Sequence, residues 1–109
     1  MSAGMLPRSW LFVPADSERK LARVRDAGAD AVILDLEDAV VPERKALARQ
    51  MSAAFLNAHA GSSGPPLWVR VNPYSSGLMH DDLAAVMPAC PAGIVLPKPD
   101  SIADVRELD

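Results

Sequence analysis

The sequence predicts an α/β protein in which four short strands of a parallel sheet alternate with helices. Four short apolar runs, at residues 10–13, 31–34, 67–72 and 93–96, are separated by longer stretches with helical spacing. Parallel sheets bury such runs, and the alternation favours right-handed β-α-β connections. The order fits an open doubly wound sheet or part of a closed (β/α)8 barrel. No glycine-rich phosphate loop follows the first run, which argues against nucleotide binding.

Four helices are expected between and after these strands. Each begins at a capping side chain or a proline; the candidate starts are Asp16 or Ser17, Pro42, Asp81 or Asp82, and Asp100 or Ser101. Gly28 suits the left-handed end of the first helix. Each helix has an apolar face; in chain order the faces are Leu21, Val24 and Ala27; Leu47, Met51, Phe55 and Ala58; Leu83, Val86 and Met87; and Ile102, Val105 and Leu108.

Composition and charge indicate a globular protein and exclude some classes of function. The chain has 109 residues, enough for one small domain, and its 50% hydrophobic and 23% charged residues are typical of globular proteins. The net charge is −3 and no cluster of Lys and Arg stands out, so we expect no nucleic-acid partner. The apolar runs are too short to span a membrane. Cys90 is the only cysteine, which suits a reducing cytoplasm, and we expect a structural thiol in a loop before the fourth strand.

The second strand ends in an unusually acidic segment. Asp35, Glu37 and Asp38 lie within four residues, and three carboxylates so close repel one another unless a cation, protons or water offset them. Ligands of parallel α/β proteins meet the carboxyl ends of the strands. We therefore favour a polar site tied to a divalent metal, directly or through its waters. The alternative is a solvated strand end that caps the following helix.

The third strand carries an arginine and an asparagine. Alternation along residues 67–72 places Arg70 and Asn72 on one face with Trp68. An arginine within a strand is costly to bury without an anion, and its planar fork fits a carboxylate. The anion is either a substrate carboxylate or a neighbouring acid, Asp35 or Glu37, and the two interpretations are compatible.

Lys98 follows the end of the fourth strand, between two prolines. There it can meet a phosphate or carboxylate. A Schiff-base role would need a strongly desolvated amine, so we favour a structural or electrostatic lysine.

Four segments together resemble one known family. They are residues 8–14, 29–40, 69–72 and 93–98, of which the acidic segment with its flanks is the most specific. Their order and spacing are similar to those of the HpcH/HpaI aldolase and citrate lyase β-subunit family, from Arg8 to the end of the chain. That family includes citryl-CoA, malyl-CoA and citramalyl-CoA lyases.

The resemblance implies an oligomeric (β/α)8 barrel that uses Mg²⁺. The metal would polarise a keto-acid oxygen and stabilise the enolate formed when the carbon–carbon bond breaks. With the residue patterns, it gives three groups of candidate residues: catalytic Asp35, Glu37 and Asp38; substrate-binding Arg70, Asn72 and Lys98; and coenzyme A-binding Phe12, Arg19 and Arg23. It also implies that Glu37 and Asp38 line the water shell of the metal.

The family's direct metal ligands, a glutamate and an aspartate, come from later strands, so we expect them beyond Asp109. Residues 1–109 are then a single incomplete domain, the N-terminal half of a (β/α)8 barrel, with an exposed apolar sheet edge. We expect this part alone to be inactive.

The first hypothesis is a Mg²⁺-dependent carbon–carbon lyase, in a cytoplasmic homo-oligomer, acting on a keto or hydroxy acid or its CoA thioester. One alternative is a pyruvate-forming aldolase of the same superfamily. Another is a non-catalytic chain that keeps these strands only for association.

Overall fold

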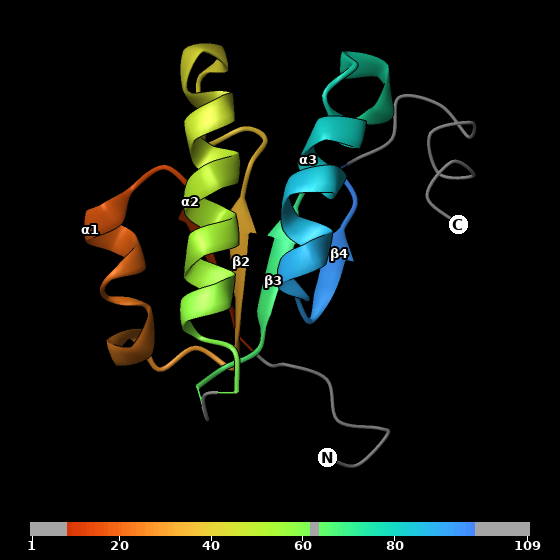
Figure 1. Ribbon diagram of the computed structural model, residues 1–109. Helices are drawn as coiled ribbons and strands as arrows, with labels where there is room; N and C mark the ends of the chain where they lie inside the picture. Colours follow the sequence, from red (N-terminus) through yellow and green to blue (C-terminus); the bar gives the residue numbers. More distant parts are fainter. Residues whose placement is uncertain (1–8, 62–63, 98–109) are drawn as a thin grey trace.

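The computed structural model describes residues 9–61 and 64–97, which form one parallel sheet flanked by helices (Figure 1). The strands are β1 (Trp10–Pro14), β2 (Ala31–Asp35), β3 (Leu67–Arg70) and β4 (Gly93–Val95). They pair in the order β1-β2-β3-β4, and all three pairings are parallel. The predicted fold class, four parallel strands alternating with helices, is confirmed.

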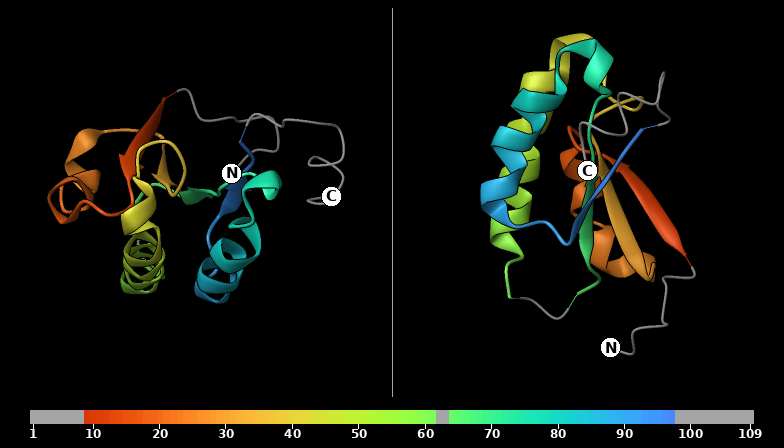
Figure 2. Two further views of the ribbon diagram at one scale, coloured as in Figure 1. Left: turned by 90° about the horizontal axis from the view of Figure 1, so that it is seen from above. Right: turned by 90° about the vertical axis from the view of Figure 1, so that its right-hand side faces the viewer.

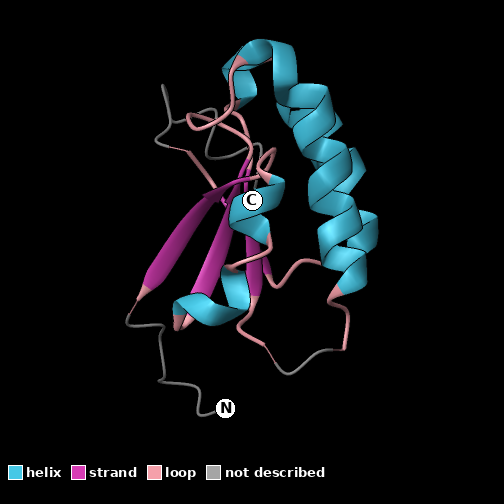
Figure 3. Ribbon diagram, turned by 90° about the vertical axis from the view of Figure 1, so that its left-hand side faces the viewer, coloured by secondary structure: helices cyan, strands magenta, loops and turns pink. Residues whose placement is uncertain are grey.

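Two helices, α2 (Lys45–Ala58) and α3 (Met79–Val86), lie side by side over one face of the sheet, as Figure 2 and Figure 3 show. The short α1 (Glu18–Leu21) contacts the edge strand β1. The remaining helical turns are 3-10 helices: η1 (Val24–Ala27), η2 (Pro42–Arg44), η3 (Tyr74–Ser76) and η4 (Met87–Ala89). Within the described residues, no helix is long and apolar enough to cross a membrane.

The hydrophobic core lies between the sheet and these helices. Side chains on this face of the strands are the most deeply buried; they include Val13, Val32, Leu34 and Val69, and Val71 just after β3 joins them. The helices contribute the other layer, including Leu21, Ala48, Leu56, Met79 and Val86. The non-directional burial of this apolar area is what holds the helices on the sheet.

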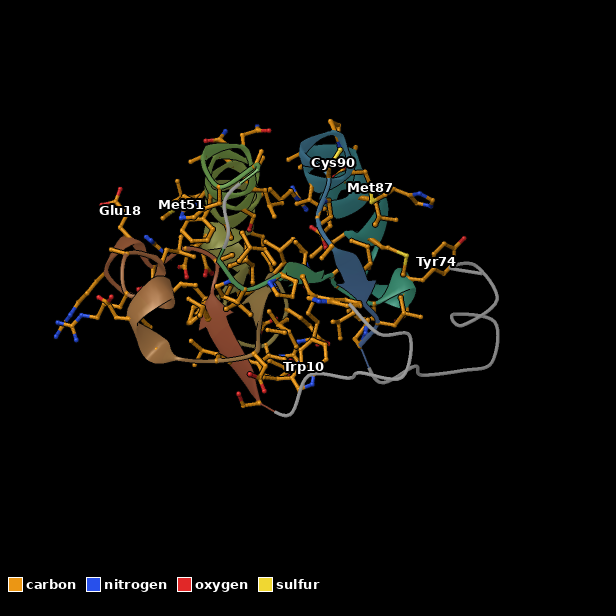
Figure 4. The ribbon with its side chains drawn as sticks, turned by 90° about the horizontal axis from the view of Figure 1, so that it is seen from below. Trp10, Glu18, Met51, Tyr74, Met87 and Cys90 are labelled. Carbon is orange, nitrogen blue, oxygen red and sulfur yellow. The ribbon has the colours of Figure 1, made fainter. Side chains whose placement is uncertain are left out.

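The opposite face of the sheet carries two rows of register partners. The row nearer the amino ends of the strands is Phe12, Ile33, Trp68 and Gly93, and the next row is Pro14, Asp35, Arg70 and Val95. In the described part of the chain no helix covers this face, and Figure 4 places Trp10 on it, away from α2 and α3. The face therefore turns from apolar to charged toward the carboxyl ends of β2 and β3.

The first predicted helix is interrupted. Ser17 caps α1 through its hydroxyl, as expected, but α1 has only 4 residues and the chain continues as η1. Gly28 ends this segment with φ 71°, which confirms the left-handed end. A 3-10 turn before such a cap is a common way to tighten the end of a helical segment.

The apolar face of α2 is rotated by one residue from the predicted stripe. Leu47 is 40% exposed, whereas Ala48, Ser52 and Leu56 are buried. The small side chains of Ala48 and Ser52 allow α2 to approach its neighbours closely, a preference that a stripe of large residues does not reveal. Met51 and Phe55 instead pack at the border of the core, beside α1.

Other boundaries also differ from the prediction. α3 begins at Met79, so Asp82 lies inside the helix and is buried, and Met87 is exposed in η4. Strand β3 ends at Arg70 and β4 at Val95, earlier than the apolar runs suggested. Lys98 and the predicted helix from Asp100 or Ser101 lie outside the described residues.

The close contact of Trp68 with Gly93 yields a test of the packing on the open face. A Cβ atom at Gly93 would lie 2.2 Å from a carbon of the Trp68 ring, so the ring would have to move. We expect Gly93→Ala to lower the free energy of unfolding by about 1–3 kcal/mol in urea denaturation, as overpacking does. In the Trp68→Leu background the same change should cost much less. An equal cost in both backgrounds would show that the ring is not responsible.

Candidate functional site

The centre of the site is an ion pair between neighbouring strands. Asp35 and Arg70 are register partners at the ends of β2 and β3, and their side chains share the open face. Arg70 donates from Nε to one carboxylate oxygen of Asp35 at 2.9 Å and from Nη2 to the other at 2.6 Å. This two-point geometry is the strong form of an arginine–carboxylate contact. The sequence-predicted ion pair is present, and Nη1 makes no hydrogen bond within the described residues.

Asp35 also organises the backbone that follows it. The same carboxylate accepts hydrogen bonds from the backbone N–H of Glu37 at 2.8 Å and of Ala39 at 3.2 Å. Burial alone would raise the pKa of Asp35, but the Arg70 side chain and these N–H groups outweigh it and hold the pKa below its ordinary value. Asp35 is therefore a buried, ionised anchor whose two oxygens are already occupied.

The other two acids, Glu37 and Asp38, are less buried and less fully hydrogen-bonded than Asp35. The Glu37 carboxylate lies 3.5 Å from Nε of Arg70 and stays partly exposed, and Asp38 is exposed. Burial, followed by the charge of Asp38, raises the pKa of Glu37 despite the nearby Arg70. Glu37 and Asp38 thus keep oxygen atoms available to an outside partner, which Asp35 does not.

Phe12 reaches the same cluster from β1, the strand on the other side of β2 from Arg70. Its ring centroid lies 5.0 Å from Cζ of Arg70, a cation–π contact, and Phe12 is 49% exposed. The ring and the Asp35 carboxylate together restrict the guanidinium group. The hydrogen bond to Asp35 raises the pKa of Arg70, so this group is a fixed positive charge.

Asn72 does not share the face of Arg70, contrary to the predicted alternation, because β3 ends at Arg70. It is 3% exposed and turned toward the helices. Its amide nitrogen donates to the backbone carbonyl of Leu36 at 3.0 Å and to Asp82 at 2.7 Å. Its oxygen accepts from Nζ of Lys45 at 2.7 Å. The predicted contact of Asn72 with substrate stays a prediction.

Three residues of this region were missed by the sequence analysis: Lys45, Arg49 and Asp82. Arg49 of α2 donates to Asp82 of α3 at 2.8 Å, and Asp82 also accepts from the backbone N–H of Asn72 at 2.8 Å. The only signal in the sequence was an aspartate at a core-facing helical position, four residues before Val86. That signal becomes informative only once the helix is known to start at Met79.

The remaining predicted residues lie apart from this cluster or outside the described part. Arg19 and Arg23 are exposed on α1 and just after it. Cys90 is a free, exposed thiol in the loop before β4, as expected. It lines a mostly apolar pocket with His59 and Leu56 at the amino ends of the strands, the end opposite to Arg70.

The described residues offer few direct ligands for a divalent metal ion. Among the described residues, no group of three or more His, Cys, Asp or Glu side chains is arranged to hold a metal ion. Asp35 is fully engaged by N–H donors. The carboxylates of Glu37 and Asp38 lie on adjacent residues, one partly exposed and the other exposed, which fits contact with the waters of a metal ion held elsewhere.

Fold and site together define an α/β protein with a charged site at the carboxyl ends of its parallel strands, in which an arginine and several acids meet. The chain belongs to the HpcH/HpaI aldolase/citrate lyase family, whose match covers residues 8–109.

Individual relatives are similar over most of this chain. A citrate lyase subunit beta-like protein of Deinococcus radiodurans is 36% identical over 94% of this chain, and human mitochondrial citramalyl-CoA lyase is 32% identical over 91%. Among solved structures, CitE of Mycobacterium tuberculosis in complex with magnesium, acetoacetate and coenzyme A matches 91% of this chain with a TM-score of 0.68 and 34% identity. The chain spans 37%, 29% and 35% of these three proteins, respectively.

The depressed pKa of Asp35 predicts how stability changes with pH. We expect Asp35→Asn to lower the free energy of unfolding at pH 7 by about 1.5–3 kcal/mol, the value of hydrogen bonds to a charged group. Because the folded-state pKa is lowered, the advantage of the wild type is complete above the ordinary value of about 4 and is lost as pH falls through the folded value.

Urea unfolding at pH 7 and at about pH 3 measures both effects. Asp26→Asn, at an exposed acid in η1, is the matched control and should follow the wild type at both pH values. An Asp35→Asn deficit that is the same size in acid would exclude a charge-dependent role for the pair.

Proposed function

We propose that the protein containing this chain is a Mg²⁺-dependent carbon–carbon lyase acting on the CoA thioester of a hydroxy acid. Residues 1–109 would supply the first four strands of a (β/α)8 barrel, as one incomplete domain. The observation that carries the proposal is the Arg70 guanidinium, which Asp35 fixes and whose Nη1 makes no hydrogen bond within residues 9–61 and 64–97. The partly exposed Glu37 carboxylate lies beside it, and the exposed Asp38 follows.

Arg70 would bind the carboxylate of the keto or hydroxy acid. Asp35 takes the Nε hydrogen and one Nη2 hydrogen, so the second Nη2 hydrogen and both Nη1 hydrogens remain to bind a substrate carboxylate. A fixed donor of this kind orients the substrate before bond cleavage, which lowers the entropic part of the barrier. The partly exposed position of Arg70 supports access from the open face.

Glu37 and Asp38 would hold the waters of the metal ion, whose direct ligands we place beyond Asp109. When bound, Mg²⁺ supplies Lewis-acid polarisation of a keto oxygen. Burial and the charges of Asp38 and Asp35 raise the pKa of Glu37 although Arg70 and Lys45 oppose this, so a further nearby cation would favour its ionised form. The magnesium in the similar CitE structures supports this assignment.

Coenzyme A would approach along the side of β1. Phe12 is exposed next to Arg70, which suits contact with the thioester end. Arg19 and Arg23 are exposed cations that suit phosphate groups. Lys98, which lies outside the described residues, would help to bind the acid part of the substrate. The CitE complex with coenzyme A supports this ligand class.

Hydrolysis of the same thioester is a second candidate. A (3S)-malyl-CoA thioesterase of Cereibacter sphaeroides is 36% identical over 93% of this chain. Lyase and thioesterase would share substrate binding by Arg70 and differ in the bond that breaks. A pyruvate-forming aldolase stays an alternative that would use a free acid. We also propose that the protein works as a cytoplasmic homo-oligomer; the exposed free thiol of Cys90 suits a reducing compartment.

Product analysis tests the proposed reaction. With malyl-CoA and Mg²⁺, we expect the protein containing this chain to release acetyl-CoA and an aldehyde acid. Free CoA and malate would instead indicate hydrolysis. Residues 1–109 alone should show neither reaction and should bind Mg²⁺ weakly by calorimetry, because the proposed direct ligands lie beyond them. Mg²⁺-dependent cleavage by the isolated 109-residue chain, verified by mass, would overturn this assignment of the ligands.

Arg70→Lys tests substrate binding. Lysine keeps the positive charge but loses the planar fork, so one charged hydrogen bond is lost. We expect kcat/KM to fall about 10- to 150-fold, corresponding to about 1.5–3 kcal/mol, if the contact persists in the transition state. The melting temperature is measured on the same preparation. An unchanged kcat/KM with a lower melting temperature would mean that Arg70 only holds the strands together.

A further inference from the structure

We propose that Lys45 is a positioning residue of the site: its ammonium group fixes the backbone of the acidic segment and thereby places Glu37 and Asp38. This inference rests on the proposed function for its catalytic consequence, but its structural content is independent of the reaction. Lys45 is the first residue of α2. Within the described residues its ammonium group donates to two backbone carbonyls and to the Asn72 side chain, and not to the carboxylates of Glu37 and Asp38.

The hydrogen bonds of Lys45 converge on one turn of the chain. Nζ donates to the backbone carbonyls of Leu36 at 2.8 Å and Glu37 at 2.7 Å, and to the side-chain oxygen of Asn72 at 2.7 Å. An ammonium group has three hydrogens, so each has one acceptor. Two of these acceptors belong to the segment that carries the acids.

The Asn72 amide can take only one orientation here. Its nitrogen faces Asp82, which only accepts, and its oxygen faces Lys45, which only donates. Asp82 is itself held by Arg49 of α2. The chain of contacts from Arg49 through Asp82 and Asn72 therefore presents the third acceptor to Lys45 in a fixed position.

Lys45 and Asp35 hold the acidic segment in complementary ways. Asp35 accepts from the N–H groups of Glu37 and Ala39, whereas Lys45 donates to the carbonyls of Leu36 and Glu37. The Glu37 backbone is thus fixed at both its donor and its acceptor. Asp35 is also the residue that fixes Arg70, so Lys45 joins the placement of the acids to that of the arginine.

Without the Lys45 ammonium, the Leu36 carbonyl keeps only the Asn72 amide at 3.0 Å, and the Glu37 carbonyl keeps only the Val40 N–H at 3.1 Å. The side-chain oxygen of Asn72 loses the one donor that it has within the described residues. We therefore expect the loss of Lys45 to loosen the segment. A part-buried polar group that loses its partner is costly to keep in place, and local opening is the response with the lowest cost in a short loop. Lysine suits this role better than arginine, because its three hydrogens diverge from one small atom, whereas the guanidinium fork is planar.

The test uses the protein that contains this chain, in three variants: Lys45→Met, Lys45→Arg and Lys20→Met. Lys20 is an exposed lysine of α1 outside the proposed site, so Lys20→Met is the matched control. Hydrogen exchange is measured without ligands. We expect Lys45→Met to speed the exchange of amides 37–40 by about tenfold or more, with amides 32–34 of β2 unchanged. Lys45→Arg should restore protection only in part, and Lys20→Met should match the wild type.

Kinetics give the second readout. In Lys45→Met, we expect kcat at saturating Mg²⁺ to fall at least about tenfold and the Mg²⁺ needed for half-activation to rise, with KM for malyl-CoA within about twofold. Unchanged exchange at amides 37–40 would overturn the proposal, as would a uniform increase across β2 and the segment. A wild-type protein without lyase activity would count against the proposed function alone, because the exchange result stands without any substrate.

Discussion

The structure around the site depends on one buried carboxylate. Asp35 is 2% exposed and accepts hydrogen bonds from Arg70 and from the backbone N–H groups of Glu37 and Ala39. A buried ionised carboxylate is tolerated only when it is paired and hydrogen-bonded. The pairing joins β3 to β2 at their carboxyl ends, and the two N–H bonds turn the chain away from the sheet toward η2. One side chain therefore sets both the strand ends and the start of the acidic segment.

Much of this arrangement follows from strand periodicity. The apolar runs identified the strands, and alternation placed Asp35 on the face opposite to Leu34 and Leu36, as observed. The ion pair of Arg70 with Asp35 was one of two compatible interpretations, because parallel neighbours bring such side chains together whether or not a substrate is present. The other interpretation, contact of Arg70 with a substrate carboxylate, rests on the guanidinium hydrogens that have no acceptor in the part of the chain that the structure describes, and it stays a proposal.

The polar layer between the strand ends and the helices was not predictable in the same way. Lys45, Arg49 and Asp82 lie on helices whose positions depend on the packing of Ala48 and Ser52, small residues that carry little signal in a sequence pattern. Alternation also failed for Asn72, because the strand had already ended. All of these errors of prediction have the same physical origin. The contacts depend on how different helices and strands pack together, and the local periodicity of the sequence carries no information about that packing.

The three acids of residues 35–38 have different partners. Asp35 neutralises an arginine, whereas Glu37 and Asp38 remain available to a cation. The Asp35 carboxylate is paired with Arg70, whereas Lys45 binds the backbone carbonyls of the segment. The side chains of Glu37 and Asp38 therefore remain directed outward. Across the cluster, three acids and two cations leave one net negative charge, enough to favour a cation without cancelling the guanidinium. If Asp35 were not neutralised in place, repulsion within residues 35–38 would push the acids apart or protonate them. In the proposed site, β3 thus contributes the anion-binding group, Arg70, and the segment after β2 contributes the cation-binding groups, Glu37 and Asp38. Because both are fixed to the same carboxylate, their separation is set by the backbone.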